Sequence, residues 1–406
     1  TFYILLVSNN NLLIILLFAG CSLSLMAQKK EISQVKQMIK KSNNLNQAEQ
    51  IMRDLLKDSA NINNDKVWNT LFDVLNKKYL NGNEALYLKR PCDTTQFYNN
   101  IAEMFKVAIC FDSIQVKANK AQKEINKSRE KYANMLLSTR ANLFNGGVFF
   151  IRKKDYNNGF DLLSLYITTA QHAIFSSYNL PQKDKYLPEA AYWTVFCGYK
   201  IQDANKALCY APLALTDSTH HANTLQYLSE IYKMNKDTVR YEQTLREGFD
   251  KYPVSPFFFS RLISFYASED NYSEGLDLVE RALAIDSLNH SFRFAKSSIL
   301  YHLKRYDQCI DICKSLLAEK DTTSGILLNI GLSYFNKAVD LSTKVGNVGK
   351  NKSKINSLYT KALGYLEEYR KREPQDKDKW AVALYTIYLN LNMGKEFEEI
   401  DKLLRK

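Results

Sequence analysis

Glycines and lysines gather at residues 343–354, where the sequence reads TKVGNVGKNKSK. A phosphate-binding loop of the P-loop type needs a glycine, four residues, a second glycine and then Lys-Ser or Lys-Thr, between a strand and a helix. Gly349 and Lys350 supply the end of that pattern, but the residue five before Gly349 is Lys344 and the residue after Lys350 is Asn351. The stretch therefore lacks the residues that would hold a nucleotide phosphate.

The histidines and cysteines form no catalytic or metal-binding pattern. The sequence contains no HExxH, no CxxC and no Gly-x-Ser-x-Gly. Cys309 and Cys313 are four residues apart and share one face of a helix, but a zinc site would need two more ligands nearby. His220 and His221 adjoin polar residues whose types are typical of helix caps. We therefore predict a protein that is not an enzyme and that uses no metal or cofactor.

The composition favours long helices and a basic surface. Only 14 glycines and 7 prolines occur in 406 residues, which is few for a protein rich in turns. The formal net charge is +12. A basic balance suits an anionic partner, although it also serves solubility alone.

The first 27 residues read as a targeting segment. Leu12–Ala27 is apolar over sixteen residues, which is short for a membrane span but has the length and small-residue end of a secretory signal. Two cleavage routes stay open: cleavage after Ala27, which we favour, or a lipobox at Phe18–Cys21 that would leave a lipidated Cys21. Both predict an exported protein, in the periplasm or at the outer membrane. Because residue 1 is Thr, we expect the true start to lie upstream.

Bulky residues recur with a period of 34 over the second half of the chain. The first of three such series contains bulky apolar or aromatic residues, and the other two contain small, apolar or aromatic residues. The three series are Tyr232, Tyr266, Leu300 and Tyr334; Tyr241, Gly275 and Cys309; and Leu245, Val279 and Cys313.

With this period, the sequence resembles the tetratricopeptide repeat family, whose unit is a helix–turn–helix of 34 residues. LLNIGLSYF (Leu327–Phe335) carries the large residue, the Gly and the aromatic at the family spacing. Small residues such as Gly331, Gly275 and Ala362 would let two antiparallel helices approach closely. The resemblance implies an all-α fold, a right-handed α-solenoid of about six or seven antiparallel helix pairs.

The repeat frame also predicts the domain organisation. Ala362 follows Cys309 by 53 residues instead of 34, which indicates an insertion of nineteen residues around 341–354, with the second helix resuming at Ser357. We expect a signal segment at 1–27, degenerate helical repeats at 28–141, the regular array at 142–406, and a capping hairpin at 380–406.

The resemblance further implies a groove lined by the second, fifth, ninth and twelfth residues of each first helix. The Lys and Asn clamp that some family members use for a terminal carboxylate is absent, which argues against binding of chaperone tails. Two interpretations stay open for the aromatic residues: they receive an amphipathic segment, or they pack within the array. The candidate groove residues are Gln226, Glu230, Lys233, Phe257, Phe294, Tyr301, Leu328, Leu332 and Phe335.

These observations favour a binding scaffold of a Gram-negative cell envelope with a protein or peptide partner. The alternative is an envelope accessory that binds an anionic glycan or lipid through its basic insertion, whose lysines are Lys344, Lys350, Lys352 and Lys354. An exported protein rarely meets nucleic acid, so we expect no nucleic-acid partner. Contact with the membrane is expected only through a lipid anchor at Cys21.

Overall fold

Helices make up every regular element in residues 28–343 and 348–405, which are the residues that the computed structural model describes; for residues 348–350 it gives the backbone only. This confirms the predicted all-α fold. The chain divides into two compact units after Asp237. The boundary near residue 141 that the repeat pattern predicts stays a prediction. None of the described helices has the length and hydropathy of a membrane span.

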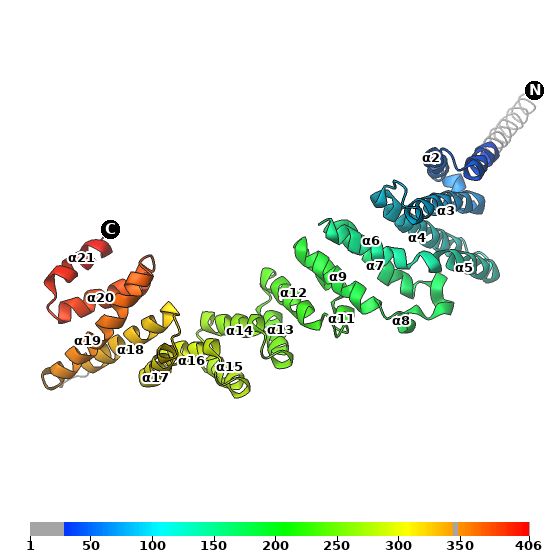
Figure 1. The fold of residues 1–406 in the computed structure, drawn as a ribbon. Coiled ribbons are helices and arrows are strands. Elements are labelled where there is room, and N and C mark those ends of the chain that lie inside the picture. Colours follow the sequence, from blue (N-terminus) through cyan, green and yellow to red (C-terminus); the bar gives the residue numbers. More distant parts are fainter. Residues whose placement is uncertain (1–27, 344–347, 406) are drawn as a thin grey trace, which may run out of the picture. The chain divides into compact units, whose positions relative to one another are not determined.

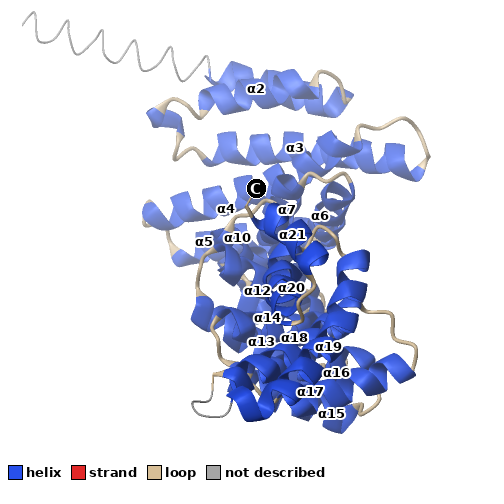
Figure 2. Ribbon diagram, turned by 90° about the vertical axis from the view of Figure 1, so that its left-hand side faces the viewer, coloured by secondary structure: helices blue, strands red, loops and turns tan. Residues whose placement is uncertain are grey.

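Unit 1 begins with a helical stretch at residues 28–41, and its first helices lie stacked one upon the next. Figures 1 and 2 both show α2, α3 and α4 in this stack. Three short 3₁₀ turns, η1 (Ser59–Asn61), η2 (Leu137–Thr139) and η3 (Ala173–Tyr178), join some of the helices. The helices are α2 (Leu45–Leu55), α3 (Asp65–Tyr87), α4 (Thr94–Lys117), α5 (Gln122–Leu136), α6 (Ala141–Arg152), α7 (Tyr156–Gln171), α8 (Leu180–Lys183), α9 (Leu187–Lys200), α10 (Ala204–Cys209), α11 (Ala211–Ala214) and α12 (His221–Met234).

A buried ion pair joins three segments of unit 1. The guanidinium of Arg140, which is 5% exposed, pairs with Asp184 and donates to the carbonyl of Tyr166 at 2.6 Å. The Tyr166 hydroxyl donates to the same carboxylate at 2.7 Å, and its ring lies 3.8 Å from the guanidinium carbon. Burial raises the pKa of Asp184, but the hydrogen bonds from Tyr166 and Arg140 lower it more, so the pKa lies below its ordinary value.

Unit 2 repeats with the period that the sequence predicts. The helices α14, α16 and α18 begin at residues 34 apart, and so do α13, α15 and α17. The final pair, α20 and α21, forms a helical hairpin, and its role as a cap stays a prediction. The helices are α13 (Thr238–Lys251), α14 (Pro256–Ser268), α15 (Tyr272–Ile285), α16 (His290–His302), α17 (Tyr306–Ala318), α18 (Ser324–Ser342), α19 (Val348–Arg372), α20 (Lys377–Asn390) and α21 (Gly394–Leu404).

Small residues lie where helices cross, as the sequence predicts. A Cβ placed on Gly331 would be 2.6 Å from the Cγ of Leu366, and one placed on Gly198 would be 2.3 Å from the backbone nitrogen of Ala207. Real Cβ atoms are not found at such distances. At these two crossings, the paired helices can therefore lie in contact only because the glycines carry no side chain.

The insertion is mostly helix, and the expectation that helix resumes only at Ser357 is wrong. The structure starts α19 at Val348, and α18 runs for 19 residues where α14 and α16 each have 13. Ile355, Leu358 and Tyr359 of α19 are buried, and the rings of Tyr359 and Phe335 lie 6.1 Å apart. The helical apolar spacing thus continues upstream of Ala362 and lengthens the pair.

Two glycines should respond to alanine in opposite directions. Gly198→Ala forces a methyl group onto the backbone of Ala207, so we expect a loss of about 1–3 kcal/mol of unfolding free energy. Gly364→Ala should gain up to about 1 kcal/mol, because no atom lies within 4 Å of the place that its Cβ would take and alanine favours helix. Urea unfolding followed by circular dichroism measures both; the same sign for both variants would contradict the crossing geometry.

The Arg140–Asp184 pair should make unit 1 sensitive to acid. A carboxyl group whose pKa is lowered in the folded state adds stability above its unfolded pKa, near 3.9, and loses it as pH falls through the folded value. We expect Asp184→Asn to cost about 3 kcal/mol at neutral pH, because Arg140 stays buried without a counter-charge. The difference in unfolding free energy between wild type and variant should become smaller below about pH 4. A difference that stays constant from neutral pH into acid would disprove the assignment.

Candidate functional site

The first helices of unit 2 present the side chains that the sequence predicts for a groove. We call the side of α14, α16 and α18 that carries their second, fifth, ninth and twelfth repeat positions the first-helix face. Phe257 on α14 is half-buried, with its ring 5.3 Å from that of Phe258 and 5.2 Å from the guanidinium carbon of Arg261. The face therefore begins with an aromatic ring that is packed on one side and partly open on the other.

The middle of the face is formed by α16 against α18. The ring of Phe294 fits over Gly325, where an added Cβ would come within 2.6 Å of the ring carbon Cζ. Tyr301 is also half-buried, and its hydroxyl accepts a hydrogen bond from the Asn336 side chain at 3.1 Å. Burial raises the pKa of Tyr301, so this residue stays a neutral phenol. Both rings are held in position by neighbouring helices.

Leu328, Leu332 and Phe335 of α18 complete the face. All three are half-buried and pack against the core of unit 2. The interpretation that these side chains pack within the array thus holds for one side of each, while the other side remains accessible. Their role in binding stays a prediction.

The first-helix face carries no charge at any of its twelve positions. Beneath it, the buried Asn329 of α18 donates to Ser297 at 3.2 Å and to Ser298 at 2.9 Å on α16. A surface of this kind can take an apolar segment without leaving an unpaired ion behind. The positions are Phe257, Ser260, Ser264, Ala267, Ser291, Phe294, Ser298, Tyr301, Gly325, Leu328, Leu332 and Phe335.

In unit 1, the predicted groove residues lie on α12. Gln226 and Glu230 are half-buried, and Lys233 is exposed. Sequence reasoning missed a denser set of side chains beside them on α9, namely Trp193, Phe196 and Tyr199.

An aromatic cluster covers α9 and the neighbouring Tyr227 of α12. Tyr199 stacks on Tyr227 with ring centroids 5.0 Å apart, and Phe196 lies 5.5 Å from Tyr227 and 5.6 Å from Trp193. The ammonium group of Lys200 lies 5.4 Å from the rings of Phe196 and Tyr199. Burial raises the pKa of Tyr227. These half-buried rings form a second aromatic surface, inside unit 1.

A signal for this cluster was present in the sequence. Ala190, Ala191 and Thr194 are buried, as are the residues 34 further on, Thr224, Leu225 and Leu228. In this register, the groove positions on α12 correspond to three positions on α9. Gln226 corresponds to Tyr192, Glu230 to Phe196 and Lys233 to Tyr199. Mapping the groove positions back by one more repeat would have found Phe196 and Tyr199, but it leads to the buried Tyr192 and not to Trp193.

The basic insertion is described only in part. Lys352 and Lys354 are exposed on α19, whereas Lys344 and the side chain of Lys350 lie outside the described residues, as does Cys21. The first turn of α19 holds no acidic residue. Lysines at a helix N-terminus oppose the helix dipole, so this arrangement does not serve the stability of the helix.

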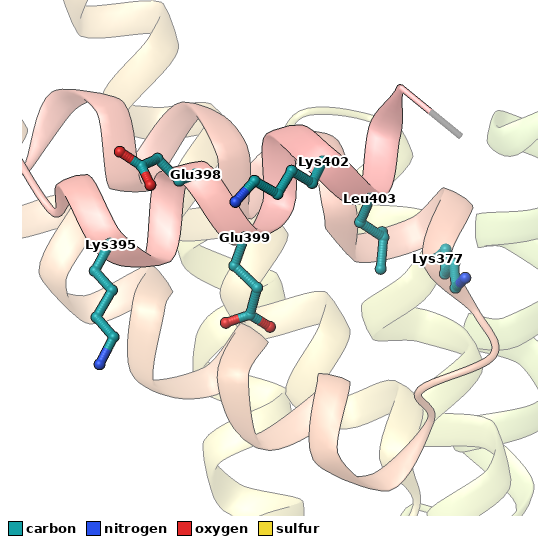
Figure 3. Close-up of a pocket in the computed structure, with 6 residues that line it drawn as sticks. All are labelled: Lys377, Lys395, Glu398, Glu399, Lys402 and Leu403. Atoms are coloured by element: carbon teal, nitrogen blue, oxygen red, sulfur yellow. The ribbon is translucent and has the colours of Figure 1, made fainter.

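Groups suited to metal binding are not brought together in the described part of the chain. No cluster of three His, Cys, Asp or Glu side chains is found there. Cys309 and Cys313 are fully buried, and the Nδ1 of His220 contacts Asp217 at 2.7 Å as part of a helix start. A hollow of about 570 Å³ on the last helix pair, shown in Figure 3, is lined by Lys377, Lys395, Glu398, Glu399, Lys402 and Leu403. Its lysines and glutamates are exposed and mixed in sign.

Comparisons with known proteins find likeness in fold only. No protein-family model and no curated protein matches the sequence. Among solved structures, the chain is similar to a tetratricopeptide repeat protein from Parabacteroides merdae, with 12% identity over 66% of this chain and 98% of that one and a TM-score of 0.37. A TPR repeats protein from Bacteroides fragilis shares 18% identity over 65% of this chain and 98% of that one, with a TM-score of 0.32.

Such low identities and TM-scores add no support of their own. The fold is identified by two features of the chain itself. Alternate helices from α13 to α18 begin 34 residues apart, and small residues lie at helix crossings. By these features, the chain has the all-α helix-pair fold of the tetratricopeptide-repeat proteins.

Proposed function

We propose that this chain is a non-catalytic, exported scaffold that binds a protein partner in the cell envelope through its first-helix face. One observation carries the proposal. The twelve groove positions on α14, α16 and α18, four on each helix, carry no charged residue, and the large side chains among them are half-buried. A few aromatic side chains held in place by their neighbours are typical of the residues that dominate binding energy at interfaces.

An amphipathic helix suits this face better than an extended polar peptide. Exposed small residues stand beside the rings at Ser260, Ser264 and Ala267. Small residues allow a partner backbone to approach, while the rings would occupy spaces between its apolar side chains. The proposed partner therefore offers an apolar stripe with helical spacing.

Removal of two aromatic rings should weaken binding of the partner strongly. We expect Phe294→Ala with Phe335→Ala to weaken binding by about 2 kcal/mol or more, roughly thirtyfold, because each ring anchors the contact from a fixed position. The partner is first captured from envelope extracts by crosslinking, then purified and titrated by calorimetry. Circular dichroism must show that the variant is still helical.

The matched control removes two apolar side chains elsewhere in the same unit. Val254 and Leu288 are 70% and 76% exposed in turns between repeats, so Val254→Ser with Leu288→Ser should leave the affinity unchanged. Equal losses in both variants would reject the first-helix face as the binding surface.

A second candidate function is binding of an anionic glycan or lipid through the insertion. The observation in its favour is the helix start at Val348, which places Lys350 in the first turn, where a cation opposes the dipole of α19. Replacing Lys344, Lys350, Lys352 and Lys354 with Gln should abolish anion binding and raise the stability of unit 2 by about 0.3–1 kcal/mol. Sedimentation with acidic polysaccharide and thermal melts measure the two effects; unchanged binding would remove this candidate.

A further inference from the structure

Cationic side chains gather on one edge of unit 1. The turns after α3, α6 and α9, and the turn after the helical stretch at 28–41, contain or adjoin eight exposed lysines and arginines. We call this surface the turn edge; its cations are Lys40, Lys41, Lys89, Arg90, Arg152, Lys153, Lys154 and Lys200.

Contacts between the helices bring these turns together. The second half of α3 meets the first half of α2 through the Lys78–Glu49 ion pair at 2.7 Å, and the start of α4 meets the end of α6 through Tyr98 and Phe149, 5.1 Å apart. The start of α7 meets the end of α9 through Tyr156 and Phe196, 5.8 Å apart. Residues from 40 to 200 therefore share one edge.

None of the eight cations forms an ion pair with an acidic side chain in the described part of the chain. The aspartates in the same turns are already in use as helix caps: Asp93 accepts from the backbone nitrogen of Gln96, Asp155 from that of Asn158, and Asp203 from that of Lys206. Glu84, on the last turn of α3, is the nearby exposed carboxylate. These four carboxylates keep their charge and offset half of the eight cations, so the turn edge is positive in net charge.

The preference of helix ends for cations applies at both edges of unit 1. At the opposite edge, Lys57 pairs with Asp54 and Lys120 pairs with Asp65, and further aspartates lie in the same turns. Lys117, Lys183 and Lys185 of that edge form no ion pair with an acidic side chain in the described residues either, so the turn edge is set apart by the exposed apolar residues at its α3 end.

Apolar side chains project from the same edge beside two of the cations. At the end of α3, Tyr87 is 85% exposed, Leu88 is 44% exposed and Leu86 is 38% exposed. Lys89 and Arg90 follow directly. Aromatic and aliphatic residues beside Lys and Arg are typical of segments that lie at the boundary between lipid head groups and acyl chains.

The backbone closes the turn after α3 and the turn after α6 in the same way, with a lysine in the left-handed region in both. Lys89 and Lys154 have φ values of 54° and 62°, a region in which glycine is preferred. The nitrogen of Arg90 donates to the carbonyl of Ala85 at 2.8 Å and that of Asp155 to the carbonyl of Phe150 at 2.9 Å, which closes both helix ends in the same way. Lysine is therefore placed where glycine would fit the backbone better.

From these observations we propose that the turn edge of unit 1 docks on an anionic lipid bilayer, with Tyr87 and its leucine neighbours entering the interface. The cations meet the head groups, and the unpaired apolar tip is what favours a bilayer over a soluble acidic polymer, which would leave the tip exposed to water. This surface is separate from the first-helix face and from the insertion of unit 2.

The test is sedimentation of the full chain with vesicles of phosphatidylcholine alone or mixed with phosphatidylglycerol. The edge variant carries Lys89→Gly, Arg90→Gln, Lys153→Gln and Lys154→Gly. We expect wild type to prefer the anionic vesicles, with binding weakened by salt. The edge variant should lose about fivefold in affinity per cation, with its melting temperature unchanged or raised because glycine suits both turns.

The matched control removes as many charges from the opposite edge, through Lys57→Gln, Lys117→Gln, Lys183→Gln and Lys185→Gln, and should bind nearly as wild type. Tyr87→Ser should weaken binding to vesicles and leave binding to soluble dextran sulfate unchanged. Equal losses in the edge and control variants, no preference of wild type for anionic vesicles, or a Tyr87→Ser variant that binds vesicles as wild type would each overturn the proposal.

Discussion

Close contact between antiparallel helices is the constraint on which the other features of this protein depend. At Gly198 and Gly331, the neighbouring helix occupies the space that a side chain would take. Because these helices cross at such a point, a residue without a side chain is needed there, and the large residues around it bury a continuous stripe. Each pair then contributes one face and one turn to surfaces that are longer than any single helix.

Two kinds of surface follow from this arrangement. The first-helix face collects one row of side chains from each repeat, so that Phe294 of α16 and Gly325 of α18 become neighbours although 31 residues separate them. The turn edge collects helix ends, where aspartates serve as N-caps and the adjacent lysines form no ion pair with them. A protein built this way can present an uncharged surface and a cationic one without either disturbing the core.

Much of the fold could be predicted because it follows from local spacing. The period of 34, the crossing at Gly331 and the last hairpin all follow from residue types along one stretch of chain. The start of α19 was misplaced because the lysines and glycines before Ser357 suggested a loop, whereas the buried Ile355 and Leu358 continue the helical stripe. The aromatic cluster around Tyr227 was missed because the repeat that contains α9 departs from the family pattern. The turn edge was beyond sequence reasoning, since its cations are spread from residue 40 to residue 200 and only the packing of α2, α4, α6 and α9 brings them together.

The most direct test of the central claim, that the first-helix face of unit 2 binds a protein partner, is hydrogen exchange of the complex compared with the free chain. If the claim is correct, bound partner slows exchange in α14, α16 and α18, and the alternate helices α13, α15 and α17 exchange as they do in the free protein. Protection that falls on α13, α15 and α17, or that is absent from all six helices, would contradict it.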